Sequence, residues 1–327
     1  MASLVVCGAI NWDVSCFVER LPVPGEEVII KHITRVSGGT GGNVAVAAAR
    51  ILGVDKVALI GALGKDDIAR QQITALEDEG VITEGIAHIA GEESGQAYIL
   101  VDQAGENVIA SHLGANAKLS LKHLNKAELN RQLQECRGIV LSDPPLGVAK
   151  ELINMAKQHS IPVLWDPGIL ISPNREALHS LAKEVEVLFL NETEVNALLG
   201  TDELNMGLKR LQELGFGNHT VLKLGAQGAA MLEIASSLIV EVLALPLKGL
   251  GLNVINTVGC GDVFAGVFAA YHVLEDNLRK SLIMASAAAG LNATRPETRG
   301  SPDRAKLEEV VDHSRELGFV LRERKLL

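Results

Sequence analysis

Residues 256–264 read Asn-Thr-Val-Gly-Cys-Gly-Asp-Val-Phe. The run Leu252–Thr257, which leads into them, has the apolar and β-branched character of a strand. Beyond them, apolar side chains recur at helical spacing as far as Leu274. This pattern predicts a strand, a glycine turn and a helix that begins near Asp262.

The predicted helix start has the properties of an anion site. Free backbone N–H groups and the positive end of the helix dipole would point at one spot, and Gly259 and Gly261 would let a bulky anion approach the backbone. Beside that spot, Asp262 could accept the proton of a hydroxyl that attacks a phosphoryl group. Alternatively, Asp262 only satisfies the helix dipole, and the residues alone leave both interpretations open.

The rest of the chain alternates short apolar runs with longer segments rich in alanine and leucine. The runs expected to form buried strands are Ser3–Gly8, Val57–Ile60, Gly138–Leu141, Val163–Trp165, Val187–Leu190 and Val221–Leu224. The segments expected to form helices are Val44–Leu52, Asp66–Glu79, Leu146–Gln158, Glu192–Leu199 and Leu204–Leu214. This alternation predicts an α/β fold with a mostly parallel sheet, helices on both faces, and ligands beyond the carboxyl ends of the strands.

Two segments interrupt this rhythm, Val14–Val36 and Ser94–Leu113. Each has the partial alternation of paired strands, the second with a Gly-Glu-Asn turn at 105–107, and each carries polar positions that a buried parallel strand would not tolerate. We predict that residues 14–36 and 94–113 form a small antiparallel β-sheet lid. Residues 1–13, 37–93 and 114–327 would form the main domain, and an ordinary edge hairpin is the alternative to a lid.

Composition narrows the class of protein. With 327 residues, 47% of them hydrophobic, the chain can form one large domain with a small appendage. A net charge of −10, the lack of a basic tract and an aromatic share of 3% argue against nucleic-acid and membrane partners. No CxxC pair, signal peptide or apolar run of roughly 18 to 20 residues is present. We expect a reduced, soluble, cytoplasmic protein without a zinc site.

Other polar residues follow predicted strands or glycine turns. Asn43 ends the glycine-rich stretch Ser37–Asn43 and could bind a substrate hydroxyl, or cap the next helix. Asn11 and Asp13 could bind vicinal hydroxyls, or close an Asx turn. Glu194 could orient Mg²⁺ directly or through water, or simply open a helix.

Phosphate-binding motifs of other folds are missing. The sequence contains no GxxxxGK[ST], and the glycines of residues 38–42 do not have GxGxxG spacing. HExxH and GxSxG are also absent. The segment Lys223–Gly228 could instead lie against a nucleotide, or be a plain hairpin connection.

In their order and type, these motifs resemble the PfkB carbohydrate kinase family (ribokinase-like) over nearly the whole chain. The segments that carry the resemblance are Gly8–Asp13, Pro22–Glu26, Ser37–Asn43, Gly95–Asn116, Asn191–Glu194, Lys223–Gly228 and Thr257–Phe264. The resemblance implies a Rossmann-like, doubly wound α/β domain with a β-sheet lid. It also implies a kinase that uses ATP and Mg²⁺ to phosphorylate a hydroxyl of a sugar, a pentose or a hexose.

The resemblance further implies roles for individual residues. Asp262 would be the catalytic base, with Gly259, Cys260 and Gly261 as the anion hole. The residues that would hold substrate are Asn11, Asp13, Gly39, Asn43 and Asp143. Those expected on the nucleotide side are Asn191, Lys223, Gly225, Gly228 and Ser286, with Glu194 on the metal side.

Three departures from the family pattern matter. Asn256 stands where the signature usually has Asp, which helps to ligate K⁺ in K⁺-activated relatives, so activation by K⁺ is doubtful here. Cys260 replaces the usual Ala but keeps the backbone amide, so we expect catalysis to survive. Thr40 and Gly41 occupy the place where ribokinases usually have Lys, which makes ribokinase activity less certain than kinase activity.

Several functions stay open at this point. A nucleoside kinase would need a slot for the base, for which the candidate residues are Val14, Cys16, Phe17, Tyr98 and His112. A phosphosugar kinase is less expected because Ser94–Leu113 has no Lys or Arg, and a noncatalytic binder would not need the Gly-Cys-Gly-Asp sequence. An exposed lid face could pair two copies into a homodimer.

Overall fold

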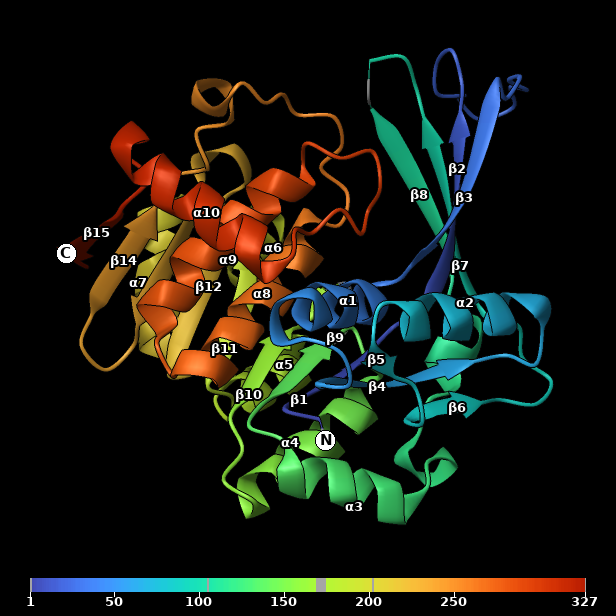
Figure 1. Cartoon of the computed structure of the whole chain (residues 1–327), viewed down its shortest axis with the longest axis horizontal. Coiled ribbons are helices and arrows are strands. Elements are labelled where there is room, and N and C mark those ends of the chain that lie inside the picture. The colour runs from blue at the N-terminus through green and yellow to red at the C-terminus, as the bar shows by residue number, and fades with distance from the viewer. Residues whose placement is uncertain (1, 105, 169–174, 202, 327) are drawn as a thin grey trace.

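A large sheet with helices on both faces forms the main body of the protein (Figure 1). The computed structural model describes residues 2–104, 106–168, 175–201 and 203–326. Across the sheet the strands follow the order β15 (Leu321–Lys325), β14 (Leu238–Val242), β13 (Ala229–Glu233), β12 (His219–Lys223), β11 (Val187–Asn191), β10 (Val163–Asp166), β9 (Ile139–Ser142), β1 (Leu4–Gly8), β4 (Val57–Leu63) and β5 (Val81–Ile82), and β6 (Ile86–His88) also pairs with β4. Neighbours from β5 to β12 run parallel and those from β12 to β15 antiparallel, which confirms the predicted α/β class.

Two groups of helices cover the sheet. One face carries α1 (Thr40–Leu52), α2 (Asp67–Asp78), α8 (Cys260–Glu275), α9 (Leu278–Asn292) and α10 (Arg304–Ser314). The other carries α3 (Lys126–Glu135), α4 (Leu146–Gln158), α5 (Arg175–Ala182), α6 (Glu192–Leu199) and α7 (Leu204–Leu214). In β1 the apolar side chains alternate between the two cores, Leu4 and Val6 facing one and Val5 and Cys7 the other. An unbroken apolar run is therefore what a strand buried on both faces requires.

Helices α1 and α8 pack against each other at very short range. Gly266 in α8 lies against the backbone of Val44 in α1, where a Cβ would come within 2.5 Å of the carbonyl oxygen. Only glycine permits this approach. The contact lies about one turn below Asp262 and beside Asn43, so it brings those two side chains together.

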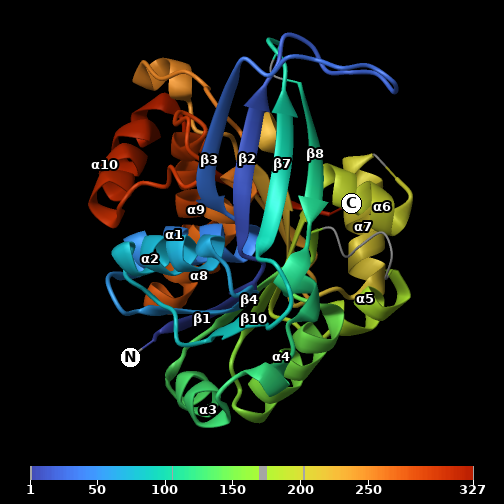
Figure 2. The ribbon, with the colours of Figure 1, turned by 90° about the vertical axis from the view of Figure 1, so that its right-hand side faces the viewer.

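The predicted small sheet stands apart from the main body (Figures 1 and 2). Its strands are β3 (His32–Gly38), β2 (Asn11–Phe17), β7 (Gly95–Val101) and β8 (Asn107–His112), in that order. Two antiparallel pairs, β2–β3 and β7–β8, join through a parallel pairing of β2 with β7. The residue Gly105 of the predicted turn lies outside the described residues, and the division at 14, 36, 94 and 113 stays a prediction.

The outer strand β8 is exposed along its whole length. It carries the apolar side chains Val108 and Ile109, which are 55% and 51% exposed. A surface of this kind is compatible with the predicted pairing of two lids. The homodimer stays a prediction.

The predicted strand Leu252–Thr257 is wrong. This segment pairs with no strand of the described chain, and instead Ile255 and Asn256 donate their N–H groups to the carbonyl of Ala293 after α9 (2.7 and 3.1 Å). Its β-branched side chains suggested a strand, yet Ile255 is 64% exposed. The edge beyond β14 is already taken by β15, so the segment crosses to the start of α8 as an extended loop.

Helix α1 also begins earlier than predicted, at Thr40 rather than Val44. Gly39, with φ of +86°, turns the chain directly into the helix. Asn43 is therefore inside the first turn of α1 and is not its cap. No helix in the described ranges is both long and apolar enough to cross a bilayer.

Candidate active site

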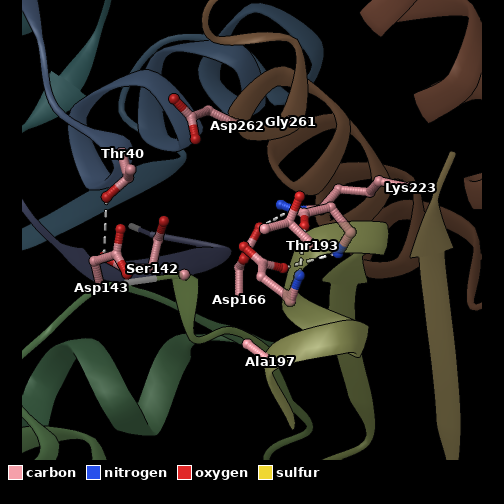
Figure 3. Close-up of a pocket in the computed structure, with 12 residues that line it drawn as sticks. Thr40, Ser142, Asp143, Asp166, Thr193, Ala197, Lys223, Gly261 and Asp262 are labelled. Carbon is pink, nitrogen blue, oxygen red and sulfur yellow. Dashed lines mark hydrogen bonds and ion pairs between the residues drawn. The ribbon is translucent and has the colours of Figure 1, made fainter. Parts of the chain in front are cut away.

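A cavity of about 450 Å³ lies at the carboxyl ends of β9 to β12. Its lining residues are Thr40, Ser142, Asp143, Asp166, Gly168, Asn191, Thr193, Glu194, Ala197, Lys223, Gly261 and Asp262 (Figure 3). Ser142, Asp166, Asn191 and Lys223 are the last residues of successive strands. This is the place where open parallel sheets bind ligands.

The start of α8 forms one wall of the cavity. Gly259 precedes the helix with φ of +79°, and no side chain caps this end among the described residues. The Cys260 N–H donates to the carbonyl of Thr257 (3.3 Å), whereas the N–H groups of Gly261 and Asp262 lie in the first turn, where a helix offers no internal partner. Of the three predicted anion-hole amides, that of Cys260 is thus already engaged.

Asp262 lies at this helix start and points into the cavity (Figure 3). Asn43 Nδ2 donates to its Oδ2 at 2.8 Å. Burial raises the pKa of Asp262 to about 7, with Asp166 and Asp13 adding to the rise and Asn43 and Lys223 opposing it. A carboxyl with this pKa can both take and release a proton near neutral pH.

Beside Asn43 lies an arginine, Arg299, that no pattern in the sequence predicts. Arg299 donates from Nε to Asn43 Oδ1 and from Nη2 to the carbonyl of Gly38, both at 3.0 Å. Its cation also acts on Asp13, whose pKa burial raises to about 6 and Arg299 lowers in part. Arg299 lies in the irregular segment between α9 and α10, where periodicity carries no signal.

Three charged side chains, Lys223, Asp166 and Glu194, meet close to the start of α8. Lys223 Nζ forms an ion pair with Asp166, and a Cβ on Gly261 would lie 3.6 Å from the same nitrogen. Burial lowers the pKa of Lys223, but Asp166 and Glu194 outweigh it and raise the value, so the amine stays charged. Asp166 was not predicted as a site residue, although it directly follows the predicted strand 163–165.

Asn191 and Glu194 form a capping box at the start of α6. Asn191 Oδ1 accepts from the Glu194 N–H and Glu194 Oε2 accepts from the Asn191 N–H, both at 2.8 Å. The helix-start interpretation of this motif is therefore confirmed. Both residues still line the cavity, so the capping box does not remove them from the site.

The predicted substrate-side residues lie near the junction of lid and main body. Asn11 Oδ1 accepts from Asn116 Nδ2 (2.9 Å), and Gly39 lies against Asn11, where a Cβ would come within 2.4 Å of the backbone nitrogen. Asp13 is two residues further along β2 and is buried. Asp143 lines the main cavity with a left-handed backbone, φ of +54°.

Three predicted nucleotide-side residues lie around a neighbouring cavity of about 610 Å³. Ala226 and Gln227, between Gly225 and Gly228, line it. A Cβ on Gly228 would come within 2.1 Å of the Val242 carbonyl. Buried Ser286 in α9 donates to the carbonyl of Leu243, which also lines this cavity (3.5 Å). Lys223 lines the first cavity, and the next residue in the chain, Leu224, lines the second.

The comparisons with known proteins agree with this geometry. The model of the pfkB family of carbohydrate kinases matches residues 1–305. Ribokinase from Haemophilus influenzae is 30% identical over 317 residues, 95% of this chain and 99% of the relative. ATP-dependent ribose-1-phosphate kinase from Halopiger xanaduensis is 28% identical, over 92% of this chain and 95% of the relative.

Among solved structures, Arabidopsis thaliana ribokinase complexed with ribose and ATP superimposes with a TM-score of 0.83. The two chains are 26% identical, and the match covers 95% of this chain and 99% of that one. The likeness thus includes both the main body and the small sheet. The chain therefore belongs to the pfkB family of carbohydrate kinases, as its motifs predicted, and is a sugar phosphotransferase.

Proposed function

We propose that the protein transfers the γ-phosphate of ATP to a hydroxyl of an unphosphorylated pentose or hexose. The observation that carries this proposal is the half-buried Asp262 carboxyl beside the uncapped start of α8, on the wall of the strand-end cavity. The resemblance to ribokinases, one of them complexed with ribose and ATP, supports ATP as donor and a sugar as acceptor.

The residues at the start of α8, together with Lys223, have complementary roles in phosphoryl transfer. Ionised Asp262 accepts the proton of the sugar hydroxyl as the hydroxyl oxygen attacks the γ-phosphorus, and the bond from that phosphorus to the bridging oxygen breaks to release ADP. The N–H groups of Gly261 and Asp262 and the positive end of α8 stabilise the charge on the phosphoryl oxygens. Lys223 adds a fixed positive charge close to Gly261, held in place by Asp166.

Mg²⁺, which the family implies, fits the residues present. Within the described ranges no group of three or more His, Cys, Asp or Glu side chains could enclose a metal. Mg²⁺ in kinases needs only one or two carboxylates beside waters and phosphates. Glu194 meets that need, because it lines the cavity. Burial and Asp166 raise the pKa of this carboxyl to about 6, and a bound cation would lower it again. The ion would neutralise charge on the phosphates.

The lid favours a sugar over a nucleoside. Side chains alternate along β2, so Asp13 and Phe17 lie on one face of the small sheet. The opposite face carries Val14, Cys16, Tyr98 and His112. Four of the five side chains considered for a base slot therefore lie on the face opposite Asp13, and only Phe17 shares the face of that proposed substrate residue.

The lid cations also argue against a phosphosugar acceptor. Arg20 forms an ion pair with Glu26, and Lys31 one with Glu19. All four side chains are well exposed to solvent. The third lid cation, Arg35, lies opposite Val14 in the register of β2 and β3, so its side chain is on the face away from Asp13. Cations paired within the lid or placed on that face are poorly positioned to neutralise a second phosphate.

A substrate panel tests the proposal. With ATP and Mg²⁺, free pentoses or hexoses are expected to give ADP release faster than nucleosides or sugar phosphates do. Coupled detection of ADP, with the product checked by mass spectrometry, separates transfer from ATP hydrolysis. ADP release with nucleosides or sugar phosphates alone would overturn the acceptor class, and none with any acceptor would overturn the proposed activity.

We also predict that K⁺ does not activate the enzyme. Asn256 Nδ2 donates to the carbonyl of Pro296 and its Oδ1 accepts from the Val258 N–H, both at 3.0 Å. The neutral amide thus bridges the two segments without a cation. Replacing Na⁺ by K⁺ at constant ionic strength is expected to leave kcat unchanged. A saturable rise with K⁺ would contradict this, and Asn256→Asp tests whether a carboxylate is what a cation needs.

A further inference from the structure

Arg299 is built into the protein directly behind Asn43. Gly42 leaves the room it needs, since a Cβ there would come within 2.6 Å of Arg299 Nη2. The backbone of Arg299 is held as well, because Arg50 Nη1 donates to the carbonyl of Arg299 (2.7 Å). The Arg50 guanidinium is itself fixed, since its Nε and Nη2 donate to the Glu79 carboxylate. The position of the Arg299 side chain is therefore fixed from both sides.

The contacts of Arg299 decide which way the Asn43 amide points. A guanidinium only donates hydrogen bonds, so the atom of Asn43 that faces it has to be the oxygen. With Oδ1 bound to Arg299 at 3.0 Å, Nδ2 is directed at Asp262, to which it donates at 2.8 Å. With the amide flipped, two acceptors would face each other at Asp262 and two donors at Arg299. The chain Arg299–Asn43–Asp262 therefore has one favourable arrangement.

We propose that Arg299 is a positioning residue for phosphoryl transfer, acting through Asn43 to hold the Asp262 carboxylate in one orientation. The inference rests on the proposed role of Asp262 as base. A base that can rotate away from the attacking hydroxyl loses the alignment on which proton transfer depends. Arg299 touches neither the transferred group nor the proton, and its contribution is the fixed direction of one side-chain amide.

The charge of Arg299 has a second effect on the same groups. It faces Asp13 from β2 and Asp262 from α8, while Arg50 and Glu79 lie on its other side. Asp166 and Lys223 act on Asp262 from the sheet. Removal of the Arg299 cation would therefore raise the pKa of Asp13 and of Asp262, and the acid side of the pH–rate profile would move to higher pH.

Three variants separate orientation from charge. Arg299→Gln is expected to lower kcat by about 10²-fold, the cost typical of misplacing a catalytic group, with KM for ATP unchanged. Arg299→Lys keeps the charge but not the planar fork, so it should keep the parent pH profile while kcat still falls. Arg295→Gln, an exposed arginine of the same segment, is the matched control and should behave like the parent.

A double-mutant cycle tests the route through Asn43. If Arg299 acts through this amide, Arg299→Gln should have little further effect in an Asn43→Ala background. Full additivity, or parent kcat in Arg299→Gln, would overturn the inference. An inactive parent would instead overturn the proposed function. If thermal unfolding shows that Arg299→Gln does not fold, the cycle is run with Arg299→Lys, for which the same two outcomes decide.

Discussion

Replacing Asp262 with Asn is expected to lower kcat by roughly 10²- to 10⁴-fold, the usual cost of losing a general base. The change is nearly isosteric, and the amide oxygen can still accept the hydrogen bond from Asn43. The protein should remain folded, because a poorly solvated carboxyl whose pKa is raised to about 7 is replaced by a neutral group. What is lost is the ability to take a proton from the acceptor hydroxyl.

The pH dependence of the parent checks the same assignment. The base acts in its ionised form, so kcat should fall as the pH drops below about 7, the pKa to which burial raises Asp262. Asp13, whose pKa burial raises to about 6, would steepen the loss at lower pH. In Asp262→Asn the step near pH 7 should be missing.

A matched control lies at the other end of the same helix. Asp276 directly follows α8, its side chain is 87% exposed, and its left-handed backbone suits Asn equally well. Asp276→Asn should leave kcat unchanged in steady-state assays. If Asp262→Asn also kept kcat within a few-fold of the parent, another group would have to be the base.

The second large effect is expected on stability. Lys223→Met should lower the free energy of unfolding by about 3 kcal/mol, as when one partner of a buried ion pair is removed. The side chains of Lys223 and Asp166 are only 14% and 10% exposed, and Glu194 shares the same cation. Without the amine, two carboxylates lie close together in a poorly solvated place. Activity should fall as well, since the cavity loses its fixed positive charge.

Urea unfolding of three variants measures this. Adding Asp166→Asn to Lys223→Met removes one of the uncompensated carboxylates, so the double variant should be more stable than Lys223→Met alone. Lys248→Met, at an exposed lysine, should change the free energy of unfolding by less than about 0.5 kcal/mol. A Lys223→Met protein as stable as the parent would show that the pair contributes nothing to the fold.

Much of the fold could be predicted because its strands are buried on both faces. Runs such as Val187–Leu190 contain no polar residue, so the strand pattern is plain in the sequence. The predicted bounds of helix Leu146–Gln158 agree with the structure at both ends. The run 252–257 failed because its β-branched residues indicate extended backbone but say nothing about whether a partner strand is free. Pairing depends on the whole sheet, and local composition does not encode it.

The candidate site was predictable where a motif marks it. Asp262 and Asn43 each follow a distinctive glycine pattern, although only the structure shows their hydrogen bond across 219 positions of sequence. Arg299 lies among turn residues and has no pattern around it. Asp166 was overlooked because a single acid after a short strand is common in any α/β protein. Long-range partners of this kind become visible only once the chain is folded.

The contact between Gly266 and Val44 bears on which sequence changes can alter the acceptor specificity of such an enzyme. This contact between the backbones of α1 and α8 lies inside the core and sets the distance between Asn43 and Asp262. Asn11 and Asp13 instead belong to the small sheet. Changes in that sheet away from Asp13 are therefore expected to alter which acceptor is admitted without moving Asn43 or Asp262. By contrast, any side chain at position 266 would wedge the two helices apart and disable transfer to every acceptor at once.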